Sequence, residues 1–164
     1  MRRRSLIAFF LSLQLLATTS SCRRRAAQST IRMADLHAAK QLISGFYRLE
    51  AGSWRWTGKT FKVQLAVPRG ASENGGFLTL QGVVTKAALQ PDGKITISSS
   101  VSGTALATEA ITKPGPFIYR ADVAPEALRS TTVPAEFRVD HTFRAPGDNR
   151  ELGVISSVIA LHSK

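Results

Sequence analysis

The sequence has almost no cysteine, because Cys22 is the only one among 164 residues. A single cysteine cannot close a disulfide within the chain, so its thiol is modified, paired with another chain, or free. The sequence also lacks an apolar segment long enough to span a membrane. The apolar run at residues 6–17 has about 12 residues, whereas a helix that crosses the hydrocarbon core needs about 20. We therefore expect no permanent transmembrane span.

Catalytic motifs are also lacking. The sequence contains no glycine-rich phosphate loop, no His and Cys set with metal-ligand spacing, and no G-x-S-x-G elbow. His141 lies between Val139 and Phe143 on an expected apolar strand face, where we interpret it as a hydrogen-bonded core residue. Its neighbour Asp140 should point to the opposite face, which argues against an Asp–His dyad. We expect a non-enzymatic protein without a cofactor or metal.

Residues 1–22, MRRRSLIAFFLSLQLLATTSSC, have the pattern of an export signal: three arginines, an apolar stretch, then small polar residues. With Ser20 and Ser21 before Cys22, this segment resembles the signals of bacterial lipoproteins, although Thr19 departs from their usual aliphatic residue. The resemblance implies lipid attachment at Cys22 after removal of residues 1–21. Thr19 and Ser21 also fit the rule for ordinary signal cleavage, so a soluble secreted form is the alternative.

Positive charge is concentrated near this end of the chain. The formal net charge is +11, and eight of the 22 Lys and Arg residues lie within the first 40 positions beside one acidic residue, Asp35. A basic run next to a lipid anchor adds about 1 kcal/mol per Lys or Arg at an anionic membrane surface. We therefore expect a membrane partner reached through the lipid, and export argues against nucleic acid as a partner.

The body of the chain alternates apolar and polar residues with the period of β-strands. In residues 60–67, Phe61, Val63, Leu65 and Val67 fall on one face. Comparable alternation recurs up to a final apolar run at 152–161, with turn residues between the runs. The pattern predicts an all-β antiparallel sandwich over residues 45–164, preceded by a basic linker at 22–44 with a short helix near 35–43.

Four segments carry a second resemblance: WRWT at 54–57, VSG at 101–103, PGPFIYRADVAPEAL at 114–128 and DNRELGVISSVIAL at 148–161. Together they resemble a small jelly-roll module, similar in layout to galactose-binding-like domains. This module recurs in bacterial proteins of surface-polysaccharide metabolism, alone or fused to glycosyltransferases and methyltransferases. The resemblance covers about residues 46–161 and implies a fold and a cell-envelope setting more than a reaction.

Two groups of residues are candidates for ligand binding. Trp54 and Trp56 are two positions apart, so on a strand they project to the same side and could stack on a sugar ring. The competing interpretation is that both rings belong to the core. Asp148 and Arg150 precede the last strand and could bind sugar hydroxyls or a carboxylate, or could form a structural ion pair.

The sequence therefore favours an exported, lipid-anchored β-sandwich at the cell envelope that binds an envelope saccharide or another envelope component. The alternative is a structural or assembly subunit that docks another envelope protein through a sheet edge or an aromatic patch, without a carbohydrate ligand.

Overall fold

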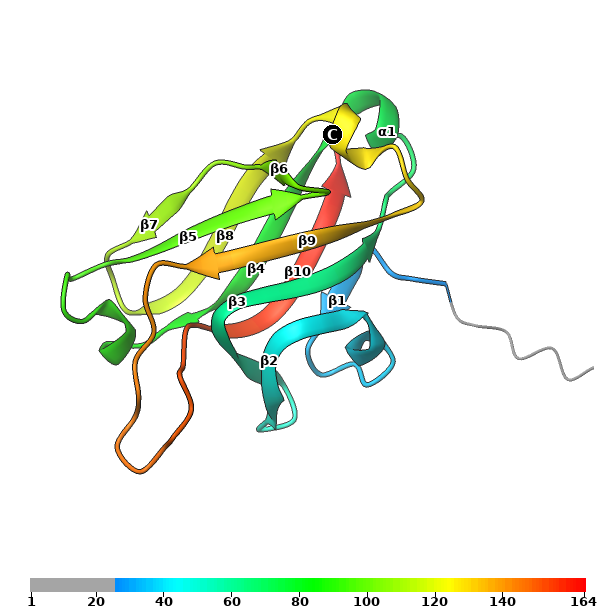
Figure 1. Cartoon of the computed structure of the whole chain (residues 1–164). Helices are drawn as coiled ribbons and strands as arrows, with labels where there is room; N and C mark the ends of the chain where they lie inside the picture. Colours follow the sequence, from blue (N-terminus) through cyan, green and yellow to red (C-terminus); the bar gives the residue numbers. More distant parts are fainter. Residues whose placement is uncertain (1–25) are drawn as a thin grey trace, which may run out of the picture.

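A computed structural model describes residues 26–164 of the chain (Figure 1). The export signal expected at 1–21 and the lipid attachment expected at Cys22 lie outside the described residues. The elements are β1 (Thr30–Arg32), η1 (a 3-10 helix, Ala38–Gln41), β2 (Leu42–Glu50), β3 (Trp54–Ala66), α1 (Ala71–Asn74), β4 (Gly76–Val84), η2 (Ala87–Leu89), β5 (Ile95–Val101), β6 (Thr104–Ala105), β7 (Glu109–Ile111), β8 (Gly115–Val123), η3 (Pro125–Leu128), β9 (Thr132–Val139) and β10 (Ile155–Ser163).

All ten strands belong to one antiparallel sheet, whose main path runs β6-β5-β9-β3-β10-β4-β8. Strands β1, β2 and β7 pair with β10, β3 and β5 respectively, outside this path. Figure 1 shows the sheet curled over, so that β5, β9 and β3 form one layer and β8, β4 and β10 form the other. The prediction of an all-β antiparallel sandwich is confirmed.

The alternation seen in residues 60–66 also sets the core. Phe61, Val63 and Leu65 are fully buried, as the period of two predicts. The Phe61 ring stacks on Phe137 of β9 with 5.1 Å between centroids, and Tyr119 of β8 meets Phe137 edge to face. These rings from both layers fill the interior of the sandwich, where each buries a large apolar area.

One polar connection crosses this core. The Tyr119 hydroxyl donates to the Ala107 carbonyl oxygen at 2.6 Å and lies 2.7 Å from the Ser99 hydroxyl of β5. Burial raises the pKa of the Tyr119 phenol, because the charged phenolate is poorly solvated there. Both contacts satisfy a hydroxyl that would otherwise be costly to bury.

Strand β3 belongs to both layers of the sandwich. Its first residues pair with β10, where Trp56 is opposite Ile155 and Arg55 is opposite Ser156. From Thr60 to Ala66 the same strand pairs with β9. Strand β2 runs beside both halves, with irregular register. The first half of β3 therefore lies where the sheet passes from one layer to the other.

The folded domain begins earlier than the sequence analysis placed it. Residues 22–44 were predicted to be a linker, but β1 pairs with β10, and Ile31 and Met33 have at most 1% of their surface exposed. The expected helix near 35–43 is reduced to η1, because Leu42 already begins β2. Three residues are too few to show the alternation of a strand, so the sequence pattern missed β1.

Two expected strands are shorter than predicted. Strand β9 ends at Val139, so His141 and Phe143 follow it in a loop. Strand β10 begins at Ile155, and the earlier Leu152 makes only an isolated bridge to Phe143. The chain between these strands therefore forms a long connection that returns to the first half of β3.

We predict that Ile31→Ala destabilises the protein by about 2 to 5 kcal/mol, because it leaves a cavity under β1. Leu36→Ala is the matched control, since Leu36 is 71% exposed and its loss should change the free energy of unfolding by less than about 0.5 kcal/mol. Urea unfolding of the two variants measures the difference. Equal stabilities would show that β1 is not part of the cooperative fold.

Candidate functional site

The candidate site lies at one end of the sandwich, where the β2–β3 hairpin meets the connection from β9 to β10. The hairpin tip follows Glu50, which is in register with Trp54. The connection is held against β3 by backbone bonds: Gly153 N–H donates to the Thr57 carbonyl at 2.7 Å, and Thr57 N–H donates to the Val154 carbonyl at 2.9 Å. Two segments far apart in sequence thus form one surface.

Close packing at Gly153 makes this docking specific. A Cβ atom at that position would lie 2.8 Å from both the Gly58 carbonyl oxygen and the Thr57 hydroxyl oxygen. The same hydroxyl accepts a bond from Val154 N–H at 3.1 Å. Only glycine lets the connection approach β3 closely enough for these bonds.

Three aromatic rings form a row across this surface. Trp54 and Trp56 are 5.9 Å apart at 89°, and Trp56 and Phe143 are 5.7 Å apart at 76°. Edge-to-face pairs of this kind are a favourable arrangement of aromatic rings. Both tryptophans are partly buried, so they are neither wholly core residues nor a flat exposed platform. Trp54 ends the row.

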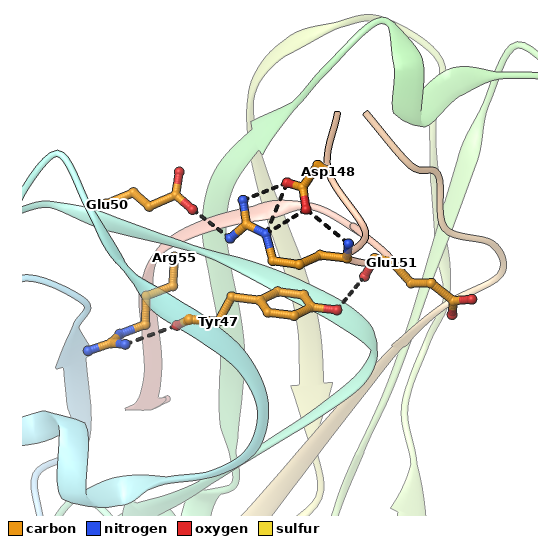
Figure 2. Close-up of polar contacts among 6 residues, drawn as sticks. Tyr47, Glu50, Arg55, Asp148 and Glu151 are labelled. Atoms are coloured by element: carbon orange, nitrogen blue, oxygen red, sulfur yellow. Dashed lines mark hydrogen bonds and ion pairs between the residues drawn. The ribbon is translucent and has the colours of Figure 1, made fainter. Parts of the chain in front are cut away.

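An arginine-centred ion cluster includes Glu50, which is in register with Trp54 of this row. Figure 2 shows the cluster. Arg150 Nε lies 3.0 Å from both Asp148 carboxylate oxygens, and Arg150 Nη2 donates to Asp148 Oδ2 at 2.7 Å. From the other side, Arg150 Nη1 donates to Glu50 Oε1 at 2.7 Å. The two carboxylates come from positions 100 and 2 residues away in the sequence.

These hydrogen bonds shift the pKa values of the cluster. The side-chain bonds from Arg150 hold the pKa of Asp148 below its ordinary value of 3.8. The bonds to Asp148 and then to Glu50 raise the pKa of Arg150 above its usual range. Each shift favours the charged form, so Asp148 and Arg150 form an ion pair at neutral pH.

The Tyr47 side chain packs against the cluster. Its ring centroid is 5.2 Å from the Arg150 guanidinium carbon, and its hydroxyl donates to the Glu151 carbonyl oxygen at 3.0 Å. A cation over an aromatic face adds about 0.5 to 1 kcal/mol at a partly exposed position. Tyr47 thereby couples β2 to the connection before β10.

The structure brings the predicted site residues to one end of the molecule. Trp54 and Trp56 on β3 were identified separately from Asp148 and Arg150, and Glu50 links the two groups, since it pairs with Trp54 and binds Arg150. Both Asp148 oxygens accept from Arg150, which is the structural ion pair offered as the alternative interpretation. A ligand-binding role for these four residues stays a prediction.

Sequence reasoning missed Glu50, Tyr47 and Phe143 as members of this surface. Glu50 stands directly before the Ala-Gly-Ser turn of the hairpin, and this position opposite Trp54 is the one local signal that could have identified it. Figure 2 shows that Arg150 binds one of the two Glu50 carboxylate oxygens, Oε1. The second oxygen can accept a hydrogen bond from a ligand hydroxyl.

The expectation that Asp140 and His141 point apart was wrong. His141 Nδ1 lies 2.9 Å from Asp140 Oδ1, and His141 Nε2 lies 2.9 Å from the Ala88 carbonyl oxygen. Neighbouring residues alternate faces only inside a strand, and β9 has already ended at Val139. The ring ties the end of β9 to η2 and is hydrogen-bonded, as predicted. It is not the core residue that we expected, because it lies in the loop after β9 with 23% of its side chain exposed.

Within residues 26–164, no group of three or more His, Cys, Asp or Glu side chains is arranged to hold a metal ion. The same part of the chain has no helix that is both long and apolar enough to cross a membrane.

No protein-family model and no curated protein matches this sequence. Among solved structures, a family GH115 4-O-methyl-α-glucuronidase with specificity for decorated arabinogalactans is similar, with a TM-score of 0.49 and 9% identity over 85% of this chain and 18% of that chain. The CBM51-2 and INT domains of ZmpB from Clostridium perfringens give a TM-score of 0.35 and 12% identity over 82% and 28%. This chain corresponds to less than a third of either protein.

We predict that Asp148→Asn lowers the melting temperature at pH 7. The pKa of Asp148 is depressed in the folded protein, so its contribution is fully present above the ordinary value of 3.8 and is lost as the pH falls through the folded value. Melting curves from pH 7 to pH 2 should therefore converge for the variant and the wild type at the acid end. Asp92→Asn, at an exposed turn residue, is the control and should change little.

Proposed function

We propose that this protein is an exported, lipid-anchored, non-enzymatic β-sandwich that binds a saccharide of the cell envelope at the end of the sandwich formed by Trp54, Trp56, Phe143 and Glu50. The aromatic row next to acidic side chains is the observation that carries the proposal. Saccharide recognition needs an apolar ring face for stacking and polar groups that fix the hydroxyls.

The geometry supports specific roles for these residues. Trp54 ends the row, so one face of its indole can receive the apolar face of a sugar ring. Glu50, opposite Trp54 on the hairpin, has a carboxylate oxygen available for a sugar hydroxyl. Arg150 holds the Glu50 carboxylate in place, because charge-assisted bonds are short and directional. Asp148 acts through Arg150, whose guanidinium it holds in place.

Lipid anchoring rests on the sequence of the first 25 residues. The apolar run at 6–17 and the small residues before Cys22 support processing at that cysteine, and three arginines follow it. Since β1 begins at Thr30, few residues separate Cys22 from the folded domain. The anchor would thus keep the sandwich close to the membrane surface, where envelope polymers are concentrated.

We predict that Trp54→Ala lowers the affinity for the recognised saccharide about tenfold or more, because a stacked ring loses its partner. A glycan array identifies the saccharide, and calorimetry on the purified full chain measures the affinity. Phe77→Ala is the matched control, since Phe77 is a partly buried aromatic residue on β4, paired with His162 at the other end of β10.

Glu50→Gln provides a second test, because it keeps the shape of the side chain and removes its charge. Saccharide binding should weaken while the fold remains intact. A blank array together with a protein partner captured by crosslinking at Trp54 would contradict the saccharide proposal and favour a docking subunit.

We predict that metabolic labelling with an alkyne fatty acid marks the wild-type chain and that Cys22→Ala abolishes the label. The reason is that Cys22 is the only thiol that can accept the lipid. Ser21→Ala, which keeps a small residue before the cysteine, should still be labelled. Equal labelling of Cys22→Ala, or an unlabelled wild type, would rule out the anchor and leave saccharide binding untouched.

A further inference from the structure

A pocket lies on the other side of β3 from the aromatic row. It has a volume of about 220 Å³ and lies between η1, the start of β2 and Arg55 of β3. Its other lining residues are Ala39, Leu42, Ile43, Ser44 and Phe46, and both polar and apolar atoms face the pocket. Because Arg55 stands between Trp54 and Trp56 in the strand, its side chain projects to the opposite face.

Arg55 is the feature that makes this pocket unusual. Its Nη1 atom donates to the Tyr47 carbonyl oxygen at 3.0 Å, whereas its Nε atom is enclosed and has no partner within residues 26–164. The ion pairs of this part of the chain include Arg144 and Arg150 and leave out Arg55. A partly buried guanidinium without an acidic partner carries a cost of desolvation that a bound anion would offset.

A second unpartnered group lies next to it. Ser156 is in register with Arg55 across the β3–β10 pair and has no exposed surface. Its hydroxyl and the Arg55 Nε atom are the two enclosed side-chain polar atoms without a hydrogen-bond partner in the described chain. Directly opposed strand residues have Cβ atoms about 5 Å apart. Two enclosed polar groups without a partner therefore belong to opposed residues at the seam of the sandwich.

Arg150 shows what the unused edge of Arg55 can bind. In Arg150, Nη1 contacts one group and the edge formed by Nε and Nη2 holds the Asp148 carboxylate side-on. In Arg55, Nη1 is likewise occupied, and the Nε edge lacks a partner. Figure 2 shows Arg55 directed away from Glu50 and Asp148, so neither carboxylate can serve both arginines.

We propose that this pocket is a binding site for a small carboxylate with an apolar body, held by the Arg55 guanidinium and by the apolar side chains of η1 and β2. The volume admits a carboxylate with a short chain or a single ring, and is smaller than the roughly 300 to 1,000 Å³ of sites for larger ligands. Since Nε is enclosed, binding includes a rotation of the Arg55 side chain that turns this edge toward the pocket. The site is independent of the proposed saccharide surface.

The test is a titration of the purified full chain with sodium hexanoate, followed by the NMR signals of the Arg55 Nε–H group and of the amides of residues 42–46. We expect saturable shifts with hexanoate and none with hexanamide, which lacks the charge. Arg55→Gln should weaken binding about ten- to hundredfold, because it removes charge-assisted hydrogen bonds. Arg48→Gln, at an exposed arginine on the neighbouring strand β2, is the control and should bind like the wild type.

Two further arms complete the test. Sodium glucuronate replaces hexanoate in a parallel titration: tighter binding of glucuronate identifies the ligand as a sugar acid, and tighter binding of hexanoate identifies it as an alkyl acid. Ser44→Trp fills the pocket from an exposed lining position and leaves Arg55 in place, so it should abolish binding even if Arg55→Gln does not fold. No saturable shift with either acid, or unchanged affinity in Ser44→Trp, overturns the proposal.

Discussion

The exchange of partners along β3 is the constraint on which this structure depends. The first residues of the strand pair with β10 and its later residues pair with β9, so one strand belongs to both layers. The sheet must therefore curl at this strand, and the Phe61 and Phe137 rings fill the space that the curl encloses. Backbone bonds from Gly153 and Val154 to Thr57 then hold the long connection against the same seam. Because both candidate sites use side chains from the first half of β3, the geometry of the seam fixes them together.

The two arginines at this seam differ in their acidic partners: Arg150 has two, and Arg55 has none within residues 26–164. Arg150 is held by two carboxylates and lies over the Tyr47 ring, so its hydrogen-bonding capacity toward the protein is largely used. Arg55 donates to the Tyr47 backbone and keeps an enclosed nitrogen without a partner. A guanidinium that is fully paired stabilises a loop, whereas one that is partly desolvated and lacks an acid favours an incoming anion. Tyr47 contacts both arginines: its ring lies under Arg150 of the ion cluster, and its carbonyl oxygen accepts from Arg55 of the pocket.

Particular elements show how far sequence reasoning reached. The alternation around Phe61 correctly predicted a strand and its buried face, because strand period is set by local geometry. Strand β1 was missed because three residues carry no readable period, and its partner Ala160 lies 130 positions away from Thr30. The contact between His141 and Asp140 was excluded on the assumption that the strand continued past Val139. In the site, Trp54, Trp56, Asp148 and Arg150 were identified as separate pairs, and Glu50 was not identified.

The sequence by itself determined the all-β class, the inward face of the main strands and the two groups of candidate side chains. These follow from residue type and short-range spacing, which act within one strand or one turn. Only the tertiary structure decided that Glu50 joins Arg150 across 100 positions, that the two tryptophans meet edge to face, and that Arg55 and Ser156 lie opposite each other. Those contacts depend on which strands pair and in which register, and pairing is settled by the packing of the whole sheet rather than by any single segment.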